Sequence, residues 1–273
     1  MLYNIVRRIP GGMKLLRRLE PYRFIGERES ELCGAFNWAT RELLAGFPIG
    51  KADTVVDVGC GEGYASQFAA RCGAAVYAVD IDPHALAAVE RHMQGQKPAR
   101  PFHTLLSDAN PLPLEDGLAT RVVAQEVLEH VDDPRQFLGE LVRIGRPGTL
   151  YLLSVPDPAS EALQKGLAPA SYWCKPNHLR VFARTEFDHL VCDAGLEIEK
   201  RLSYSFFWAM WWLLFWACES DFEIGSPGAP VLTHWHKTWT ALLKTPNGPR
   251  IKQALDDLMP KSQVIVARKP LAA

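Results

Sequence analysis

The sequence contains no long apolar run, no excess of one charge and no framework of paired cysteines. Its most apolar stretch, from Leu202 to Cys218, has 17 residues, which is fewer than the ~20 that a helix needs to span a bilayer. The formal net charge is −1, so the chain lacks the basic excess that is typical of proteins that bind long nucleic acids. We therefore expect no transmembrane helix and no nucleic-acid partner.

Cysteine use and length narrow the class further. The six scattered cysteines include no C-x-x-C pair, which indicates reduced thiols and a cytoplasmic protein. The N-terminal stretch has neither the long apolar segment nor the cleavage site of a signal peptide. With 273 residues, of which 48% are hydrophobic, the chain is long enough for one large α/β domain with an insertion or a small cap.

The most informative stretch is a strand that breaks into a glycine-rich loop. Residues 54–58 are rich in β-branched side chains and predict a buried parallel strand. Glycines follow at every second position, at Gly59, Gly61 and Gly63, where the absence of a Cβ allows positive φ and close approach of a ligand. Residues 64–72 predict a helix, whose N-terminus offers free N–H groups. This arrangement predicts a nucleotide site on a doubly wound sheet.

The spacing of these glycines separates two kinds of nucleotide. A dinucleotide fingerprint requires G-x-G-x-x-G, but its third glycine position falls on Tyr64 here. Asp57, two residues before the first glycine, would repel a pyrophosphate and suits a ligand with a cationic amino-acid end. Asp80 ends the next predicted strand, where a carboxylate can accept hydrogen bonds from both ribose hydroxyls. A helix N-cap is the alternative role for Asp80, but Asp82 fills that position better.

Beyond the loop, the chain alternates strands and helices in a rhythm that predicts an α/β, doubly wound, mostly parallel sheet. The expected strands are residues 54–58, 74–80, 102–106, 121–125, 150–155, 197–202 and 263–268. The expected helices are residues 64–72, 83–93 and 184–194, with one more that begins at Pro134. Residues 1–50 are expected to form an N-terminal helical segment, including an amphipathic helix over residues 31–44.

About 60 residues separate the last two predicted strands, and a structureless loop of that length would be unusual. We therefore expect an aromatic-rich helical cap over residues 205–260, inserted between core segments 51–204 and 261–273. Four tryptophans lie within residues 206–217. This segment is expected either to wall an apolar acceptor pocket or to lie at a membrane surface, where Trp favours the headgroup level. Packing for stability or dimerisation is the alternative.

Taken in order, these motifs resemble those of class I S-adenosylmethionine-dependent methyltransferases of the small-molecule, ubiquinone-biosynthesis type. The resemblance rests on D-x-G-x-G-x-G from Asp57, LPLEDG over residues 112–117, AQEVLEHV over residues 124–131 and the segment 176–199. It implies a seven-stranded Rossmann-like sheet with an antiparallel last strand, and S-adenosylmethionine as the cofactor. The chain has Ala-Thr where the family commonly has Phe-Asp, and Pro-Gly-Thr where it commonly has Pro-Gly-Gly. Neither position carries chemistry in the family.

The resemblance and the chemistry of the loop together assign a cofactor site. The expected cofactor-binding residues are Asp57, Gly59, Cys60, Gly61, Gly63, Asp80, Ile81, Asp108, Ala109 and Gln125. Asp108 is placed to accept a hydrogen bond from the adenine amine, with Leu106 and Ala109 beside the ring. An aspartate that only forms a turn is an equal alternative for Asp108.

Two histidines are the candidates for catalysis. A hydroxyl acceptor must lose its proton, most often to His or a carboxylate. His130 follows the fourth predicted strand, and His178 lies in the loop after the fifth strand, which lines the acceptor site in the family. A histidine that only fixes the loop is the alternative for His130. The predicted function is methyl transfer to a small hydrophobic acceptor, at oxygen rather than carbon or nitrogen.

A rival function keeps the fold without the reaction. In it, a non-catalytic protein binds S-adenosylmethionine or lipid and uses the aromatic cap for contact with a partner or with a membrane surface. The basic, apolar N-terminal segment would add attraction to anionic lipid. The sequence leaves the oligomeric state open.

One metal-binding pattern is present as well. Glu126, Glu129 and His130 resemble the E-x-x-E-H metal site of small-RNA 2′-O-methyltransferases. Two carboxylates and an imidazole are able to hold a hard or borderline cation. However, Leu-Glu-His is frequent among metal-free relatives, and the basic surface that RNA needs is missing. We therefore expect no metal.

Overall fold

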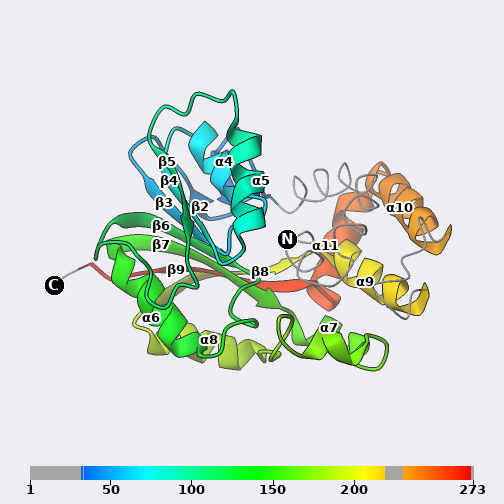
Figure 1. The fold of residues 1–273 in the computed structure, drawn as a ribbon. Coiled ribbons are helices and arrows are strands. Elements are labelled where there is room, and N and C mark those ends of the chain that lie inside the picture. Colours follow the sequence, from blue (N-terminus) through cyan, green and yellow to red (C-terminus); the bar gives the residue numbers. More distant parts are fainter. Residues whose placement is uncertain (1–31, 33, 219–229, 272–273) are drawn as a thin grey trace.

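A seven-stranded sheet forms the centre of the computed structural model, which describes residues 32, 34–218 and 230–271 (Figure 1). The strand order is β5-β4-β3-β6-β7-β9-β8. Neighbours from β5 to β7 run parallel, whereas β9 runs antiparallel to β7 and β8. The strands are β3 (Thr54–Val58), β4 (Ala75–Asp80), β5 (Phe102–Leu106), β6 (Ala119–Gln125), β7 (Gly145–Pro156), β8 (Glu197–Tyr204) and β9 (Ser262–Arg268). The predicted Rossmann-like sheet with an antiparallel last strand is confirmed.

Helices cover both faces of this sheet. One face carries α4 (Tyr64–Arg71) and α5 (Pro83–Met93), and the other carries α6 (Pro134–Ile144) and α8 (Arg184–Asp193) (Figure 1). The central strand β3 is buried on both sides: Val55 belongs to the cluster of α4, and Val56 belongs to the cluster of α6 and α8. Burial on both faces explains why β3 reads as an unbroken apolar run.

The topology fixes where a ligand would bind. The strand β3 lies between β4 and β6, so the chain leaves β3 in one direction and later returns to its other side. In open α/β sheets, ligands bind at such a switch point, outside the carboxyl ends of the strands. The glycine loop follows β3, and residues 126–130 follow β6, so these two segments border the expected crevice.

The helix expected over residues 31–44 is wrong from residue 34 onward, because residues 34–41 form turns, bends and an isolated bridge. Two short antiparallel strands follow, β1 (Glu42–Leu44) at the end of the expected helix and β2 (Phe47–Pro48) just after it. Leu43, Leu44 and Phe47 are buried against the face of the sheet that carries α4, so tertiary packing overrides helical spacing. Of the helical segment expected over residues 1–50, residues 1–31 and 33 lie outside the described residues, and residues 34–50 contain no helix.

Among the described residues between β8 and β9, where an insertion was expected, the chain forms three helices. They are α9 (Phe206–Cys218), α10 (Pro230–Leu243) and α11 (Gly248–Leu258), and they gather with α7 (Pro158–Gln164) at one end of the molecule (Figure 1). We call α9, α10 and α11 the helical insertion. In the described part of the chain, no helix is long and apolar enough to cross a membrane.

The helix α9 turns most of its aromatic side chains inward. Phe207, Trp211 and Phe215 recur at every fourth position and are buried, so they lie on one face of the helix. Trp212 and Trp216 join the same core, which also includes Trp239 of α10. The aromatic segment is therefore the core of the helical insertion.

Candidate functional site

The three glycines of the loop all adopt a left-handed backbone conformation, and two of them also make room for neighbouring side chains. All three take positive φ, with values of 71°, 54° and 73° for Gly59, Gly61 and Gly63. A Cβ on Gly59 would overlap Val127, and a Cβ on Gly63 would lie 2.7 Å from Cγ2 of Val89. These two glycines thus make room for protein side chains, and the loop packs between the turn after β6 and helix α5.

Asp80 holds the glycine loop by hydrogen bonds. Its side chain is buried, and Oδ2 accepts a hydrogen bond from the backbone N–H of Gly61 at 2.8 Å. Oδ1 accepts from the N–H of Asp82 at 2.9 Å. Asp82 itself caps α5 by accepting from the N–H of His84 at 2.8 Å, as predicted. The contact of Asp80 with the two ribose hydroxyls stays a prediction.

Two apolar side chains stand in solvent beside Asp80. Ile81 is 58% exposed and Leu106 is 62% exposed, and Asp80 pairs with Leu106 where β4 meets β5. Exposed large aliphatic side chains beside a buried carboxylate fit a ligand with an apolar ring next to a ribose, as in an adenine nucleoside. The residues present therefore suit the expected cofactor.

The segment after β5 forms a turn. The exposed Asp108 accepts a hydrogen bond from the N–H of Asn110 at 3.0 Å, and Ser107 Oγ accepts from the N–H of Ala109 at 3.0 Å. Ala109 is buried with φ of 61°. This geometry matches the turn-forming alternative for Asp108, and its contact with adenine stays a prediction. Gln125, at the end of β6, is half-buried.

Asp57 faces the first turn of α4. Its carboxylate is buried and accepts a hydrogen bond from Ser66 Oγ at 2.6 Å. Burial raises the pKa of Asp57 to about 6, although the bond from Ser66 works in the opposite direction. Burial also raises the pKa of the Cys60 thiol far above its ordinary value, which disfavours the thiolate form at this position.

Replacing Asp57 by Asn should change how stability depends on pH. Between about pH 4 and pH 6 the folded protein keeps a proton on Asp57 that the unfolded chain has lost, so this group lowers the free energy of unfolding as pH rises. The gain in stability of Asp57→Asn over wild type should grow by up to about 3 kcal/mol between pH 4 and pH 8. Urea unfolding of both proteins at several pH values measures it. A gain that does not change with pH would contradict the raised pKa.

A second group of buried polar residues lies at the carboxyl ends of β6 and β7. His178 is buried, and its Nδ1 lies 3.0 Å from Oε2 of Glu161 on α7. Burial alone would raise the pKa of Glu161, but His178, Lys261 and Tyr172 together bring it below its ordinary value. The other ring nitrogen of His178, Nε2, is buried and has no hydrogen-bond partner.

The two predicted histidines lie together. The ring centroids of His130 and His178 are 5.1 Å apart. His130 Nδ1 lies 2.9 Å from the carbonyl oxygen of Asn177, and His130 Nε2 lies 3.6 Å from Oε1 of Glu129. His130 therefore contacts the loop that carries His178, which fits its alternative role, and its part in catalysis stays a prediction.

The two glutamates of the E-x-x-E-H pattern have different surroundings. Glu126 accepts from Lys261 Nζ at 3.0 Å and from Ser154 Oγ at 3.1 Å. Glu129 is fully buried, and neither of its carboxylate oxygens has a hydrogen-bond partner. Burial, together with the nearby charge of Glu126, raises the pKa of Glu129 well above its ordinary value.

Sequence reasoning missed two members of this group, Glu161 and Lys261. Lys261 is fully buried just before β9, and although burial lowers its pKa, Glu126 and Glu161 outweigh that effect and raise it. A lysine before a strand and a glutamate in a short helix usually face solvent. No local pattern distinguishes these two residues, because their partners are distant in sequence.

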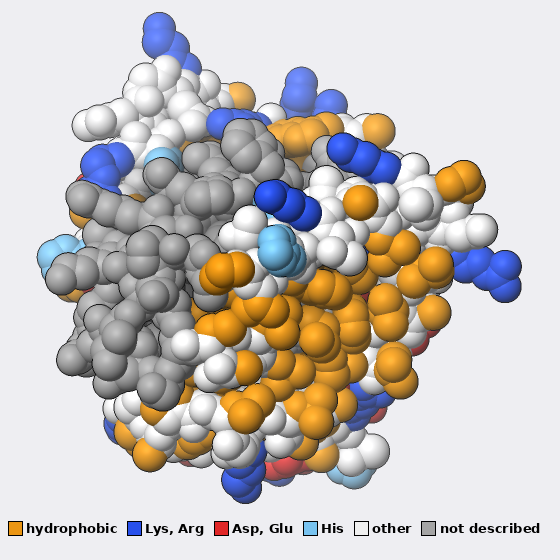
Figure 2. Space-filling view, turned by 90° about the vertical axis from the view of Figure 1, so that its right-hand side faces the viewer, with side chains coloured by type: hydrophobic (Ala, Val, Ile, Leu, Met, Phe, Trp, Pro, Cys, Tyr) orange, Lys and Arg blue, Asp and Glu red, His pale blue; other side chains and the backbone are white. Residues whose placement is uncertain are grey.

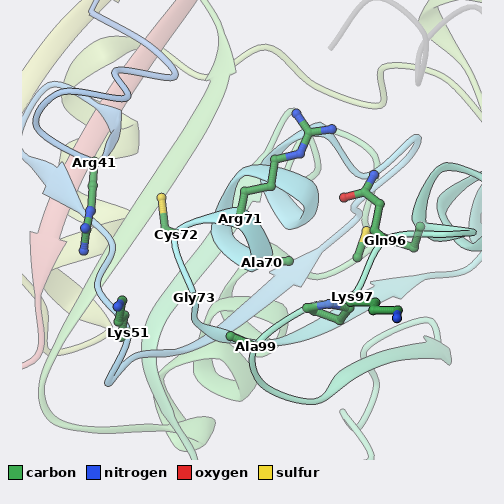
Figure 3. Close-up of a pocket in the computed structure, with 11 residues that line it drawn as sticks. Arg41, Lys51, Ala70, Arg71, Cys72, Gly73, Gln96, Lys97 and Ala99 are labelled. Carbon is green, nitrogen blue, oxygen red and sulfur yellow. The ribbon is translucent and has the colours of Figure 1, made fainter.

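A surface pocket of about 280 Å³ lies elsewhere (Figure 3). Its lining includes Lys51, Gly73 and Ala99, which precede β3, β4 and β5. The pocket therefore lies at the amino ends of the strands, whereas the glycine loop lies at their carboxyl ends. It has no part in the site described above.

Comparison with known proteins shows similarity to methyltransferases. Residues 56–153 match the protein family described as methyltransferase domain. Over 149 residues the chain is 31% identical to a probable S-adenosylmethionine-dependent methyltransferase of Mycolicibacterium smegmatis, covering 54% of this chain and 53% of that protein. It is 31% identical over 153 residues to the ubiquinone biosynthesis O-methyltransferase of Caulobacter vibrioides, covering 49% and 58%. The chain thus spans about half the length of these relatives.

A solved methyltransferase structure has a similar fold. The S-adenosylmethionine-dependent methyltransferase of Mesorhizobium loti aligns with a TM-score of 0.54 and 19% identity, covering 87% of this chain and 99% of that one. Identity this low shows the fold alone. Together with the matched domain over residues 56–153, it supports one conclusion: in this domain and in its fold, the chain is similar to S-adenosylmethionine-dependent methyltransferases.

Proposed function

We propose that this protein transfers a methyl group from S-adenosylmethionine to an oxygen atom of a small hydrophobic acceptor. The observation that carries the proposal is His178, a buried histidine whose Nδ1 is held by Glu161 and whose Nε2 has no hydrogen-bond partner. It lies beside His130, which is hydrogen-bonded through its N–H to Val127, the neighbour of Gly59. This connects a candidate proton acceptor to the expected cofactor loop.

The cofactor site would be formed by residues of the chain around the loop. When bound, S-adenosylmethionine supplies an electrophilic methyl group on a sulfonium. Asp80 would accept from the ribose hydroxyls, Ile81 and Leu106 would enclose the adenine ring, and Asp57 would face the cationic end. Holding donor and acceptor in line can supply ~7–11 kcal/mol of the barrier reduction.

The proposed role of His178 is to take the proton from the acceptor hydroxyl. Because the carboxylate of Glu161 accepts from Nδ1, the lone pair of the neutral ring is on Nε2. Tyr172 and Gln164 donate to Oε1 of Glu161 at 3.3 and 3.2 Å, which keeps that carboxylate in place. The named activity of the Caulobacter vibrioides relative, an O-methyltransferase, supports oxygen as the acceptor atom.

The helical insertion, which we propose as a cap over the acceptor site, is connected to this histidine. The ring of Tyr172 lies 4.5 Å from the ring of His178 and 5.3 Å from the ring of Trp216 on α9, measured between centroids. Trp216 Nε1 donates to Oε1 of Gln164 at 2.9 Å. A hydrophobic acceptor beside such a cap would be shielded from water during transfer.

A second role follows from an apolar surface. Figure 2 shows hydrophobic side chains gathered on the face of the molecule that carries the helical insertion and α7. On these helices Leu163 is 54% exposed, Leu167, just after α7, is 48% exposed, and Leu258 is 71% exposed. Contact with a membrane surface, in addition to catalysis or without it, is the alternative that this face favours.

An assay of methyl transfer with labelled S-adenosylmethionine tests the proposal. We expect label to move to hydrophobic phenols, and not to their O-methylated or purely amine analogues. Sedimentation with anionic vesicles tests the alternative on the same preparation. Vesicle binding with tight S-adenosylmethionine binding but without transfer to any hydroxyl compound would favour the non-catalytic protein.

A further inference from the structure

The pocket at the amino ends of β3, β4 and β5 carries charge of one sign (Figure 3). Its volume of about 280 Å³ is close to the lower end of the range for pockets that hold small molecules. Four cationic side chains contribute to its lining, namely Arg41, Lys51, Arg71 and Lys97. In the described part of the chain, no acidic residue lines it. The pocket is therefore suited to an anion.

Separate segments of the chain bring these cations together. Lys51 lies in the turn before β3, and its stem packs on Gly73, where a Cβ would lie 2.9 Å from Cγ of Lys51. Arg71 ends α4, and Lys97 lies between α5 and β5. Nη1 of Arg100, just before β5, donates to the carbonyl oxygen of Lys51 at 3.2 Å. Packing and hydrogen bonding thus hold the segments that form the pocket.

Arg41 adopts a backbone conformation that is unusual for a long side chain. Its φ is 57°, in the left-handed region, and its carbonyl oxygen accepts a hydrogen bond from the N–H of Ile49 at 2.9 Å. Non-glycine residues in this region are uncommon and cluster at functional sites. In Figure 3 the side chain of Arg41 extends toward Lys51. The chain therefore places a guanidinium at the pocket where glycine or asparagine would fit the backbone better.

Neither neighbouring acids nor helix ends neutralise this positive charge. Glu42 accepts hydrogen bonds within its own turn, and Asp53 is paired with Arg121 at 3.1 Å. Within the described residues, no ion pair engages the four cations of the lining. The helices α4 and α5 end at the pocket, but their two C-termini together carry only roughly one negative charge. A positive potential remains, and the walls of a pocket concentrate it.

We propose that this pocket binds the phosphate group of a small phosphomonoester that is free in solution. Such a group carries nearly two negative charges and three acceptor oxygens, which arginine and lysine bind through charge-assisted hydrogen bonds. Ala70, Met93 and Pro98 supply apolar lining for a short organic body. The proposal does not depend on the proposed function, because the cofactor and acceptor sites lie at the carboxyl ends of the strands.

A lipid headgroup would offer the same phosphate chemistry. However, the apolar face of the molecule lies on the helical insertion and α7, which adjoin the carboxyl end of β7 where Pro156 pairs with Ser262 (Figures 1 and 2). The pocket lies at the other ends of the strands, so a flat membrane that contacts this apolar face does not reach it. This arrangement favours a soluble ligand.

Calorimetry with n-butyl phosphate at low ionic strength tests the site, with n-butanol as the probe that lacks a phosphate. We expect one n-butyl phosphate per chain and no binding of n-butanol. Lys51→Met and Arg71→Gln keep most of the apolar stem, and each should bind roughly tenfold more weakly because one charge-assisted hydrogen bond is lost. The exposed Lys244 and Arg250 provide matched controls, since Lys244→Met and Arg250→Gln should bind as wild type does.

Three results would overturn the site. They are no saturable binding of n-butyl phosphate by wild type, wild-type affinity in both pocket variants, and binding to vesicles that contain phosphatidic acid without binding of n-butyl phosphate. If circular dichroism shows that a pocket variant does not fold, acetylation of wild type decides. Bound n-butyl phosphate should slow acetylation of Lys51 and Lys97 but not of Lys244, and equal rates at all three would contradict the site. Competition with S-adenosylmethionine would place the phosphate at the cofactor site instead.

Discussion

Protein carrying Gly61→Val is expected to fold and to bind no S-adenosylmethionine. Gly61 has φ of 54°, and its N–H donates to Asp80. A β-branched residue in the left-handed region costs ~1–2 kcal/mol. The substituted loop therefore either keeps its backbone conformation at this cost or relieves the strain by changing its conformation. If it keeps its shape, the valine side chain stands in the expected ligand space. If it relaxes, Asp80 loses the bond that orients it.

The control for this variant is Gly95→Val. Gly95 also takes positive φ, at 76°, and a Cβ there would meet nothing within 4 Å. It lies between α5 and β5, away from the glycine loop. Calorimetry should show a similar loss of stability in both variants and the loss of S-adenosylmethionine binding in Gly61→Val alone. Wild-type affinity in Gly61→Val would place the cofactor elsewhere.

Replacement of His178 by Ala should lower kcat for methyl transfer by ~10²–10⁴, which is the usual contribution of a proton-transfer group. Binding of S-adenosylmethionine should change little, because His178 lies in the segment after β7 and the cofactor loop follows β3. Steady-state kinetics with saturating cofactor, together with calorimetry, separate the two effects.

His178→Ala is compared with His189→Ala, whose side chain is exposed on α8. We expect wild-type kcat in the control. Full activity of His178→Ala would remove His178 from the mechanism. An equal loss of cofactor affinity and kcat would mean that His178 only supports the fold, and thermal unfolding of the variant would then show a matching loss of stability.

Much of the fold could be predicted because its signals are local. The helix that begins at Pro83 is capped by Asp82, and the strand over residues 102–106 has the predicted bounds. The helix that was predicted from apolar spacing is wrong at residues 42–44, where Leu43 and Leu44 pack against the sheet in a short hairpin. Only contacts that are distant in sequence decide between the two structures there.

The site was predictable in part for the same reason. The spacing of residues in the sequence predicts the glycine loop and Asp80, and in the structure a hydrogen bond connects them. The pairing of His130 with His178, and the roles of Glu161 and Lys261, depend on how four separate loops and helices pack together. Trp211 and Trp212 of the aromatic segment are buried in the core of the helical insertion, and the contact of this segment with an acceptor stays a prediction.

The most direct test of the account is calorimetric binding of S-adenosylmethionine to wild type, Asp80→Ala and Asp82→Ala. Wild type should bind one molecule with micromolar or tighter affinity, on the order of −8 kcal/mol. Asp80→Ala should bind at least tenfold more weakly, because two charge-assisted bonds to the ribose and the bond to Gly61 are lost. Asp82→Ala, which removes only the cap of α5, should bind as wild type does. No binding by wild type, or unchanged affinity in Asp80→Ala, would contradict the proposed cofactor site.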